Sequence, residues 1–212
     1  PDWQIDGTTG YDAMAELNLM LGDPGAQDWM SVEYVETTGD QLTVAEHVLQ
    51  GKRFVAQTLF SAEVNRIIRE LPVVPADVEA TADTLRELAA RVPVYRSYLP
   101  DNAGTLARAI HRLREDRPER GLNIDELEPT LVDPDAVAAK RFEQLSGAVM
   151  AKGVEDTAWY RHSRQIGLNE VGGHPGELGC DLADTHEAFE RRLRVLPRSM
   201  TALSTHDTKR GE

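Results

Sequence analysis

The chain has 212 residues, a formal net charge of −13, 28% charged residues and one cysteine, Cys180. A surface this negative repels phosphate backbones, and no stretch reaches the roughly 20 apolar residues of a membrane helix, so we expect neither nucleic acid nor a membrane as partner. One cysteine permits no intrachain disulfide and fits a reducing compartment, so we expect a cytoplasmic protein.

The first predicted elements are a short strand over residues 3–9 and a helix that ends at the turn of residues 22–25. Between them lies the sequence Gly-Thr-Thr-Gly-Tyr-Asp over residues 7–12. Glycines allow close backbone approach, so this segment is a candidate ligand loop with Thr9 and Tyr11 as contacts. The alternative is a strand-to-helix turn in which Thr9 or Asp12 caps the helix.

The clearest predicted helix begins at Thr43, which has the capping-box spacing with Glu46. Apolar residues recur at helical spacing from there to residue 71, and Gly51 is expected to bend the helix. Further helices are predicted over residues 78–92, around residues 106–113, from Pro134 onward and over residues 185–196. An extended segment over residues 93–99, a glycine-rich loop over residues 169–180 and a buried strand over residues 200–205 complete the pattern.

The charged run over residues 205–210 is the first candidate for chemistry. It follows the predicted strand, and in βα barrels the active-site groups project from the C-terminal ends of strands. Asp207 there can accept hydrogen bonds from sugar hydroxyls, and His206 can donate one. A solvated charged turn is the alternative interpretation.

A second candidate covers residues 152–161, which contain two carboxylates, two cations and two aromatic side chains. Aromatic rings stack on pyranose faces, while ions and amides bind sugar hydroxyls. The alternative is a helix N-terminus with acids at its positive end and Trp159 in the core. The remaining histidines are dispersed without zinc spacing, so no metal site is expected.

Five strings occur in the order found in maltooligosyl trehalose synthases, which are enzymes of the α-amylase superfamily. They are GTTGYD at residues 7–12, VPVYRSYL at 92–99, AKGVEDTAWYR at 151–161, NEVGG at 169–173 and STHDTKRGE at 204–212. The chain resembles this family over essentially its whole length. The resemblance opposes two alternatives: a stand-alone helical binding module, and another glucan hydrolase or a sucrose-acting transferase of the same superfamily.

The resemblance implies a mainly α fold, in which a helical insertion domain is flanked by two strand segments of an incomplete (β/α)₈ barrel. Residues 1–22 would hold the sixth strand and its helix, residues 23–198 the helical insertion, and residues 199–212 the seventh strand with its active-site turn. We therefore expect the two ends of the chain to lie close together and the middle to be helical.

The family converts the reducing-end α-1,4 linkage of a maltooligosaccharide to an α,α-1,1 linkage by intramolecular transglycosylation, without a cofactor. A retaining mechanism of this kind uses a nucleophile and a general acid. In the family both motifs lie upstream of the GTTG string. We therefore expect this chain, which begins with Pro1, to be a piece of a longer protein. It would need the remainder of the barrel in cis and be inactive alone.

The resemblance places the superfamily's third acid at Asp207, with His206 beside it, as the expected catalytic residues. Asp207 would grip ring hydroxyls rather than transfer a proton. The expected substrate-binding residues are Lys152, Glu155, Asp156, Tyr160, Arg161, Thr9, Tyr11, Lys209 and Arg210. For Lys209 and Arg210, bracing the site through ion pairs is the alternative role.

Overall fold

The computed structural model describes residues 5–209, and this part of the chain is mainly helical, with no β-strand. It divides into two compact units. The first unit is Val48–Ala158, and the second combines the chain up to His47 with the chain from Trp159 onward. The predicted mainly α fold is confirmed. The predicted barrel and insertion boundaries concern the longer protein, and they stay a prediction.

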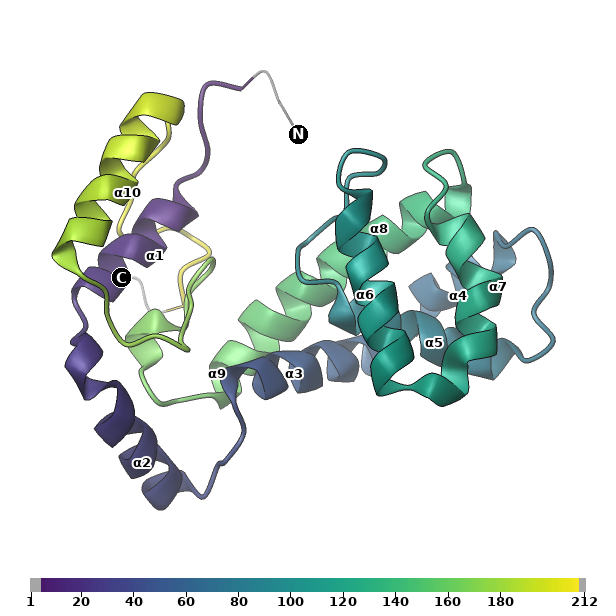
Figure 1. Ribbon diagram of the computed structural model, residues 1–212, viewed down its shortest axis with the longest axis horizontal. Helices are drawn as coiled ribbons and strands as arrows, with labels where there is room; N and C mark the ends of the chain where they lie inside the picture. Colours follow the sequence, from purple (N-terminus) through teal and green to yellow (C-terminus); the bar gives the residue numbers. More distant parts are fainter. Residues whose placement is uncertain (1–4, 210–212) are drawn as a thin grey trace. The chain divides into compact units, whose positions relative to one another are not determined.

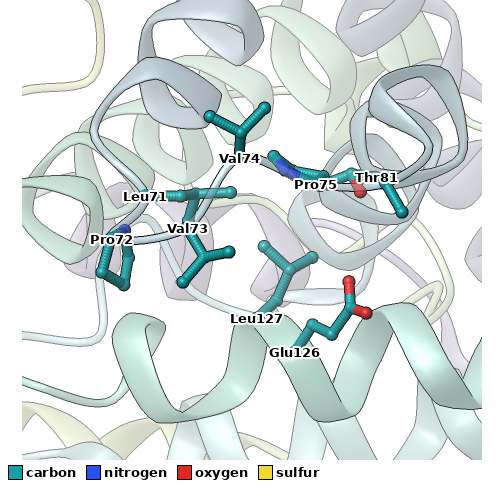
Figure 2. A pocket seen from close by; sticks show the side chains of 9 residues that line it. Leu71, Pro72, Val73, Val74, Pro75, Thr81, Glu126 and Leu127 are labelled. Carbon is teal, nitrogen blue, oxygen red and sulfur yellow. The ribbon is translucent and has the colours of Figure 1, made fainter.

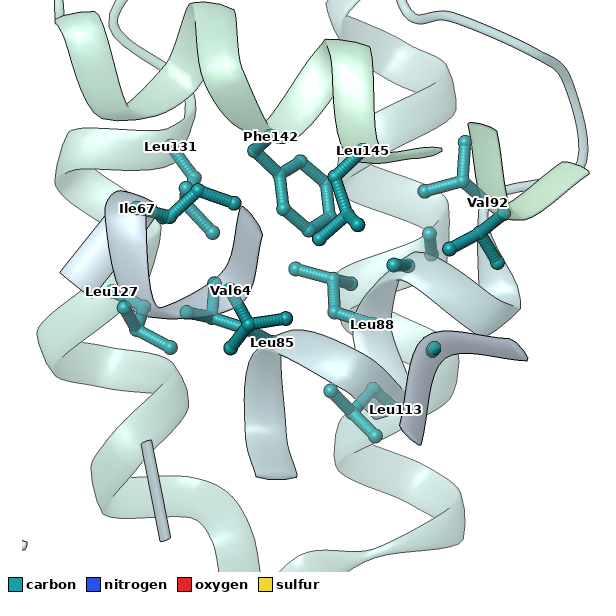
Figure 3. Close-up of a cluster of buried hydrophobic side chains, with 14 of the residues drawn as sticks. Val64, Ile67, Leu85, Leu88, Val92, Leu113, Leu127, Leu131, Phe142 and Leu145 are labelled. Carbon is teal, nitrogen blue, oxygen red and sulfur yellow. The ribbon is translucent and has the colours of Figure 1, made fainter. Parts of the chain in front are cut away.

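The first unit is a bundle of helices around one apolar core (Figure 1). Its elements are most of α3 (Val44–Thr58), α4 (Ser61–Arg69), α5 (Val78–Arg91), α6 (Ala103–Asp116), η2 (Pro118–Arg120), α7 (Gly121–Leu131), α8 (Val137–Met150) and the π-helical segment η3 (Ala151–Ala158). Leu85, Leu113 and Phe142 are at most 1% exposed in this core (Figure 3). Each such side chain stabilises the fold by about 1.5–3 kcal/mol through burial.

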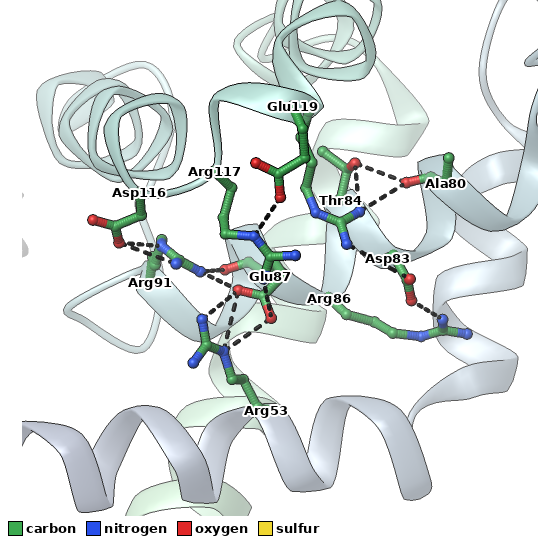
Figure 4. A network of polar contacts seen from close by, with 11 residues as sticks. Arg53, Ala80, Asp83, Thr84, Arg86, Glu87, Arg91, Asp116, Arg117 and Glu119 are labelled. Atoms are coloured by element: carbon green, nitrogen blue, oxygen red, sulfur yellow. Dashed lines mark hydrogen bonds and ion pairs between the residues drawn. The ribbon is translucent and has the colours of Figure 1, made fainter.

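Glu87 is a buried acid on α5 that is surrounded by arginines (Figure 4). Arg53 Nη2 donates to Glu87 Oε2 at 2.8 Å, and Arg91 donates to the same carboxylate. Burial alone would raise the pKa of Glu87, but the hydrogen bonds from Arg53 and Arg91 outweigh it and lower that pKa. The buried charge is therefore compensated, and it joins α3 to α5.

The second unit has shorter helices and more loop. Its elements are α1 (Tyr11–Met20), η1 (Pro24–Ala26), α2 (Gln27–Thr38), the first turn of α3, α9 (Trp159–Arg161), η4 (Ile166–Leu168) and α10 (Leu182–Val195). Helices α1 and α10, from opposite ends of the chain, pack against each other (Figure 1). The glycine-rich segment over residues 169–180 is a loop, as predicted.

The two segments that were predicted as strands lie side by side without forming a sheet. Met200 N donates to Thr8 O at 2.9 Å, and Thr8 N donates to Ser199 Oγ at 3.1 Å. Gly10 has a φ of 81°, and a Cβ there would lie 2.0 Å from Met200 O, so only glycine fits. The prediction that the end segments meet is confirmed where residues 7–10 contact residues 199–200. Trp3 lies outside the described residues. Two strands without further partners are marginal, which explains the missing ladder.

Several predicted helix boundaries were wrong. The helix expected over residues 43–71 is broken at Leu59 and Phe60 into α3 and α4, and the break is not at Gly51. Gly51 instead allows a close contact, because a Cβ there would lie 2.3 Å from Gly153 O. Helix α8 begins at Val137 rather than Pro134, since Asp133 Oδ1 accepts a hydrogen bond from Asp135 N and closes a turn first.

The ends of other helices follow the expected chemistry. Thr43 and Glu46 form the predicted capping box: Thr43 N donates to Glu46 Oε2 at 2.7 Å, and Glu46 N donates to Thr43 Oγ1 at 3.2 Å. Helix α10 begins three positions before the predicted start, because Asp181 caps it by accepting from Ala183 N. In the alternative interpretation of residues 7–12, Thr9 or Asp12 would cap α1; Gly10 occupies the cap position instead, without a side-chain bond.

Candidate functional site

The charged run at the end of the chain folds into a tight turn within the second unit. Thr208 N donates to Thr205 O at 3.1 Å, and Thr208 Oγ1 donates to the same carbonyl at 2.7 Å. Asp207 N donates to Thr205 Oγ1 at 3.2 Å. These bonds fix the backbone at Asp207, while its side chain remains 53% exposed. The turn therefore presents a carboxylate toward solvent in a defined orientation.

Tyr11 holds this carboxylate from the other end of the chain. Its hydroxyl donates to Asp207 Oδ2 at 2.8 Å and lies 3.3 Å from Thr205 Oγ1. His206 Nε2 lies 3.3 Å from the same Asp207 oxygen and is largely exposed. Tyr11 and Asp207, predicted from two separate strings, are thus direct neighbours. Tyr11 was predicted as a substrate contact, but its hydroxyl donates to Asp207, so Tyr11 also orients this carboxylate.

A second group of predicted residues meets beside this turn. Lys209 N donates to Glu170 Oε2 at 2.6 Å, and Lys209 Nζ lies 5.8 Å from the centre of the Tyr160 ring, within cation–π range. Tyr160 is exposed and Glu170 is buried. Sequence reasoning did not select Glu170, although its NEVGG string was among those that carried the resemblance.

The loop that carries Tyr11 is braced by helix α10. Arg192 pairs with Asp12, and its Nη2 donates to Thr8 Oγ1 at 3.3 Å. Burial acts to raise the pKa of Asp12, but the Arg192 guanidinium more than offsets it and lowers that pKa. Thr9, a predicted contact residue, lies exposed in this loop. Arg192 was not predicted, because nothing in the sequence relates α10 to residues 8–12.

The KGVEDTA string forms the π-helical segment η3, which continues α8 in the first unit. Thr157 Oγ1 donates to Lys152 O five residues earlier at 2.8 Å, and Lys152 Nζ pairs with Asp156 at 2.6 Å. Gly153 sits against α3, where a Cβ would lie 2.6 Å from Lys52 Cα. Segments of π-helix are rare in proteins overall, but many of those that occur lie at functional sites. The predicted residues Lys152, Glu155 and Asp156 share this segment.

The aromatic pair after η3 divides into one buried and one exposed ring. Trp159 is 5% exposed, so the core interpretation holds for it, while Tyr160 and Arg161 are exposed. Asn169 Nδ2 donates to Trp159 O at 3.0 Å, which fixes the end of the helix. Arg210 lies outside the described residues. The predicted residues are therefore gathered in two places, one in each unit: residues 152–156 on η3, and Tyr11, Tyr160, His206, Asp207 and Lys209 in the second unit.

A hollow in the first unit contains none of these residues (Figure 2). It has a volume of about 340 Å³ and is lined mainly by the apolar turn after α4, with Val73 and Val74 largely exposed, and by Leu127 of α7. Its lining offers Glu126 as a charged side chain. Apart from Glu126 and Thr81, the residues that line it are apolar. None of the helices within residues 5–209 is long and apolar enough to cross a lipid bilayer.

Comparison with known proteins relates the chain to one enzyme family. No protein-family model matches it. A Mycobacterium tuberculosis protein named as a maltooligosyl trehalose synthase is 35% identical over 221 aligned positions, which cover 100% of this chain and 28% of that protein. The solved maltooligosyltrehalose synthase of Arthrobacter ramosus matches with a TM-score of 0.92 and 42% identity over 100% of this chain and 28% of that one. A Sulfolobus tokodaii structure described as a maltooligosyl trehalose synthase matches with a TM-score of 0.73 and 28% identity, covering 99% of this chain and 26% of its own. The chain is therefore similar over its whole length to one segment, 26–28% of the length, of proteins named as maltooligosyl trehalose synthases.

Proposed function

We propose that this chain is the segment of a maltooligosyl trehalose synthase that supplies the hydroxyl-gripping acid, Asp207, to a retaining active site. The full-length protein would convert the reducing-end α-1,4 linkage of a maltooligosaccharide to an α,α-1,1 linkage, as a (1→4)-α-D-glucan 1-α-D-glucosylmutase of the α-amylase superfamily. The observation that carries the proposal is the presentation of Asp207: its backbone is fixed by the turn, its side chain is exposed, and Tyr11 donates to one of its oxygens.

Asp207 would act through hydrogen bonds to the sugar. A carboxylate that accepts from ring hydroxyls favours the distorted, oxocarbenium-like ring of the transition state more than the relaxed ring of the substrate. Tyr11 occupies one oxygen of this carboxylate at 2.8 Å, which supports an orientation in which the other oxygen faces the sugar. His206 would donate to a neighbouring hydroxyl. Tyr160, Arg161, Lys209, Arg210 and Thr9 are proposed as further substrate contacts, together with Lys152, Glu155 and Asp156 on η3.

Bond cleavage would come from the remainder of the barrel in cis. The exposed apolar side chains on α2, Trp29 and Val32, suit a surface that the rest of a larger protein covers. We propose a cytoplasmic location, no nucleic-acid or membrane partner, and no turnover by the isolated chain. The first experiment incubates this chain alone with maltopentaose and follows loss of reducing ends. Turnover by a clean preparation would contradict the assignment of the cleaving carboxylates to another segment.

The decisive experiment uses the full-length protein with Asp207→Asn. We expect the rate of non-reducing product formation from maltopentaose to fall by at least about a thousandfold, because interactions made mainly in the transition state carry this step. Substrate binding, measured by calorimetry, should persist. The matched control is Asp184→Asn, an exposed acid on α10, which should leave the rate unchanged. Full activity of the Asp207 variant would remove this residue from its proposed role.

A further inference from the structure

Three side chains that the proposed function does not use converge in the second unit. They are Asp40, after α2; His47, in the first turns of α3; and His162, directly after α9. Their ligand-capable atoms all lie within 4.8 Å of one another. The two histidines are far apart in the sequence, so no spacing rule could relate them. The fold alone brings two imidazoles and a carboxylate together.

His162 is the unusual member of this cluster. It is 3% exposed, and within the described part of the chain neither ring nitrogen has a hydrogen-bond partner. Buried polar groups are nearly always paired, and leaving two ring nitrogens unpaired costs free energy. Its ring lies 5.1 Å from the His47 ring and 5.2 Å from the Tyr34 ring, measured between centroids. The unprotonated ring nitrogen of a neutral His162 has a lone pair that could bind a metal ion together with His47 and Asp40.

The other two side chains are held together by a hydrogen bond that a metal ion between them would replace. His47 Nε2 lies 2.7 Å from Asp40 Oδ2, and Leu42 N donates to the other carboxylate oxygen at 3.0 Å. Tyr34 Oη donates to Asp40 as well. The bonds from Leu42 and Tyr34 are outer hydrogen bonds of the kind that fix the orientation of a metal-bound carboxylate. Asp40 is therefore oriented from two sides.

We propose that Asp40, His47 and His162 form a binding site for a divalent transition-metal ion, with Zn²⁺ as the best-fitting ion. Two imidazole nitrogens and one carboxylate oxygen are a donor set that Zn²⁺ accepts, with water as the fourth ligand. Asp40 and His162 line a cavity of about 420 Å³, which has room for that water. Tetrahedral zinc with bonds of about 2.0–2.1 Å needs ligand atoms about 3.3 Å apart. The pair of His47 Nε2 and Asp40 Oδ2, now 2.7 Å apart, would therefore open slightly on binding, while ligand atoms as far apart as 4.8 Å would move closer together.

One nearby charge opposes the ion and one property of the cluster favours it. Arg164 also lines the cavity, but its Nη2 donates to the carbonyl oxygens of Pro175 and Gly176, at 2.7 and 3.0 Å. The property that favours the ion is the Asp40 carboxylate, whose negative charge lies within 4.8 Å of the ligand atoms of both imidazoles. The ion would join the end of α2, the start of α3 and the segment that follows Tyr160.

The test is zinc binding by the wild-type chain after chelator treatment. Calorimetry should give one Zn²⁺ per chain, and the melting temperature should rise by about 5–10 °C at a hundredfold excess of free Zn²⁺ over the dissociation constant. His162→Ala and the nearly isosteric Asp40→Asn should each weaken binding by at least about tenfold. The matched control is His174→Ala combined with His186→Ala, which removes two exposed histidines from the same unit and should leave binding unchanged.

A measurement on the wild-type chain guards against variants that fail to fold. Anomalous diffraction at the zinc edge, from crystals grown with Zn²⁺, should place the ion between the three side chains. The proposal is overturned if the folded wild-type chain binds no Zn²⁺, if the ion lies elsewhere, or if folded His162→Ala binds it as tightly as the wild type. Because none of these readouts depends on catalysis, the result is independent of the proposed function.

Discussion

At the scale of single residues, Tyr11 and Asp207 show what the sequence could and could not predict. Each residue was selected from its own string, and the resemblance suggested both as site residues. Their 2.8 Å hydrogen bond was not predictable, because it depends on α1 and α10 packing together and on the meeting of the chain's two ends. Glu170 and Arg192, which hold Lys209 and the Tyr11 loop, were missed for the same reason.

Tyr11→Phe in the full-length protein tests this hydrogen bond. Loss of a hydroxyl that donates to a carboxylate costs about 1.5–3 kcal/mol, so we expect kcat to fall by roughly ten- to a hundredfold. The melting temperature should stay within a few degrees of the wild type, since Tyr11 is only partly buried. Tyr95→Phe, at an exposed tyrosine, is the control. An unchanged kcat would show that Tyr11 does not position Asp207.

Lys52 is a buried lysine whose charge is costly. It is 2% exposed, its Nζ donates to Val92 O at 2.5 Å, and burial lowers its pKa to about 8. The unfolded chain binds the proton up to a pKa of about 10.4, so between these values the unfolded state holds more protons. The contribution of Lys52 to the free energy of unfolding therefore rises with pH, by roughly 3 kcal/mol from pH 8 to above pH 10.

Lys52→Met should remove this dependence. Urea unfolding at several pH values should show the wild type gaining stability relative to the variant as pH rises through this window. Lys140→Met, at an exposed lysine of α8, should track the wild type throughout. A constant difference between Lys52→Met and wild type would mean that Lys52 keeps an ordinary pKa in the folded chain.

At the scale of secondary structure, helices with a strong local signal were predicted and those without one were missed. The capping box of α3 and the apolar face of α5 could be predicted because each depends only on residues that are close together in the sequence. Helix α2 was missed because it buries none of its residues, so it has no apolar stripe facing a core. Helix α7 was missed because it contains Pro129, which normally argues against a helix interior.

The contact between α3 and η3 depends on Gly51 of α3 and Gly153 of η3. At Gly153 an added Cβ would lie 2.6 Å from Lys52 Cα, which is backbone and has little freedom to move. We therefore expect Gly153→Ala to lower the free energy of unfolding by about 2 kcal/mol through overpacking. Gly104→Ala, in α6 with only a flexible arginine tip nearby, should stabilise by about 0.5–1 kcal/mol through helix propensity. Equal urea midpoints for the two variants would contradict the close contact.

At the scale of the whole molecule, the two units have different means of support. Within residues 5–209, the twenty buried residues of the main apolar core all belong to the first unit. The second unit is held by α1 against α10 and by polar contacts such as Arg192 with Asp12. The mainly helical character was predictable from periodicity, whereas this division was not, since it depends on which chain segments share a core.

A polypeptide of residues 43–158 should consequently fold by itself. It retains the capping box of α3, the complete core and the Glu87 network. We expect a strongly helical circular dichroism spectrum and one cooperative thermal transition. Leu85→Ala in this polypeptide should lower stability by about 2–5 kcal/mol. A broad, non-cooperative melt of the unsubstituted polypeptide would show that the core needs the rest of the chain.

The backbone bond between Thr8 and Met200 has a consequence for how such a segment can change during evolution. Because the chain enters and leaves at neighbouring positions, the segment between residues 8 and 200 forms a closed loop. A change in the length of this segment therefore does not change the distance between the two flanking positions. Helices can be lengthened, shortened or exchanged inside this segment while the two flanking positions keep their separation. A library of homologues joined at these two positions would therefore be expected to tolerate large substitutions of the interior, provided the pairing of residues 8 and 200 is preserved.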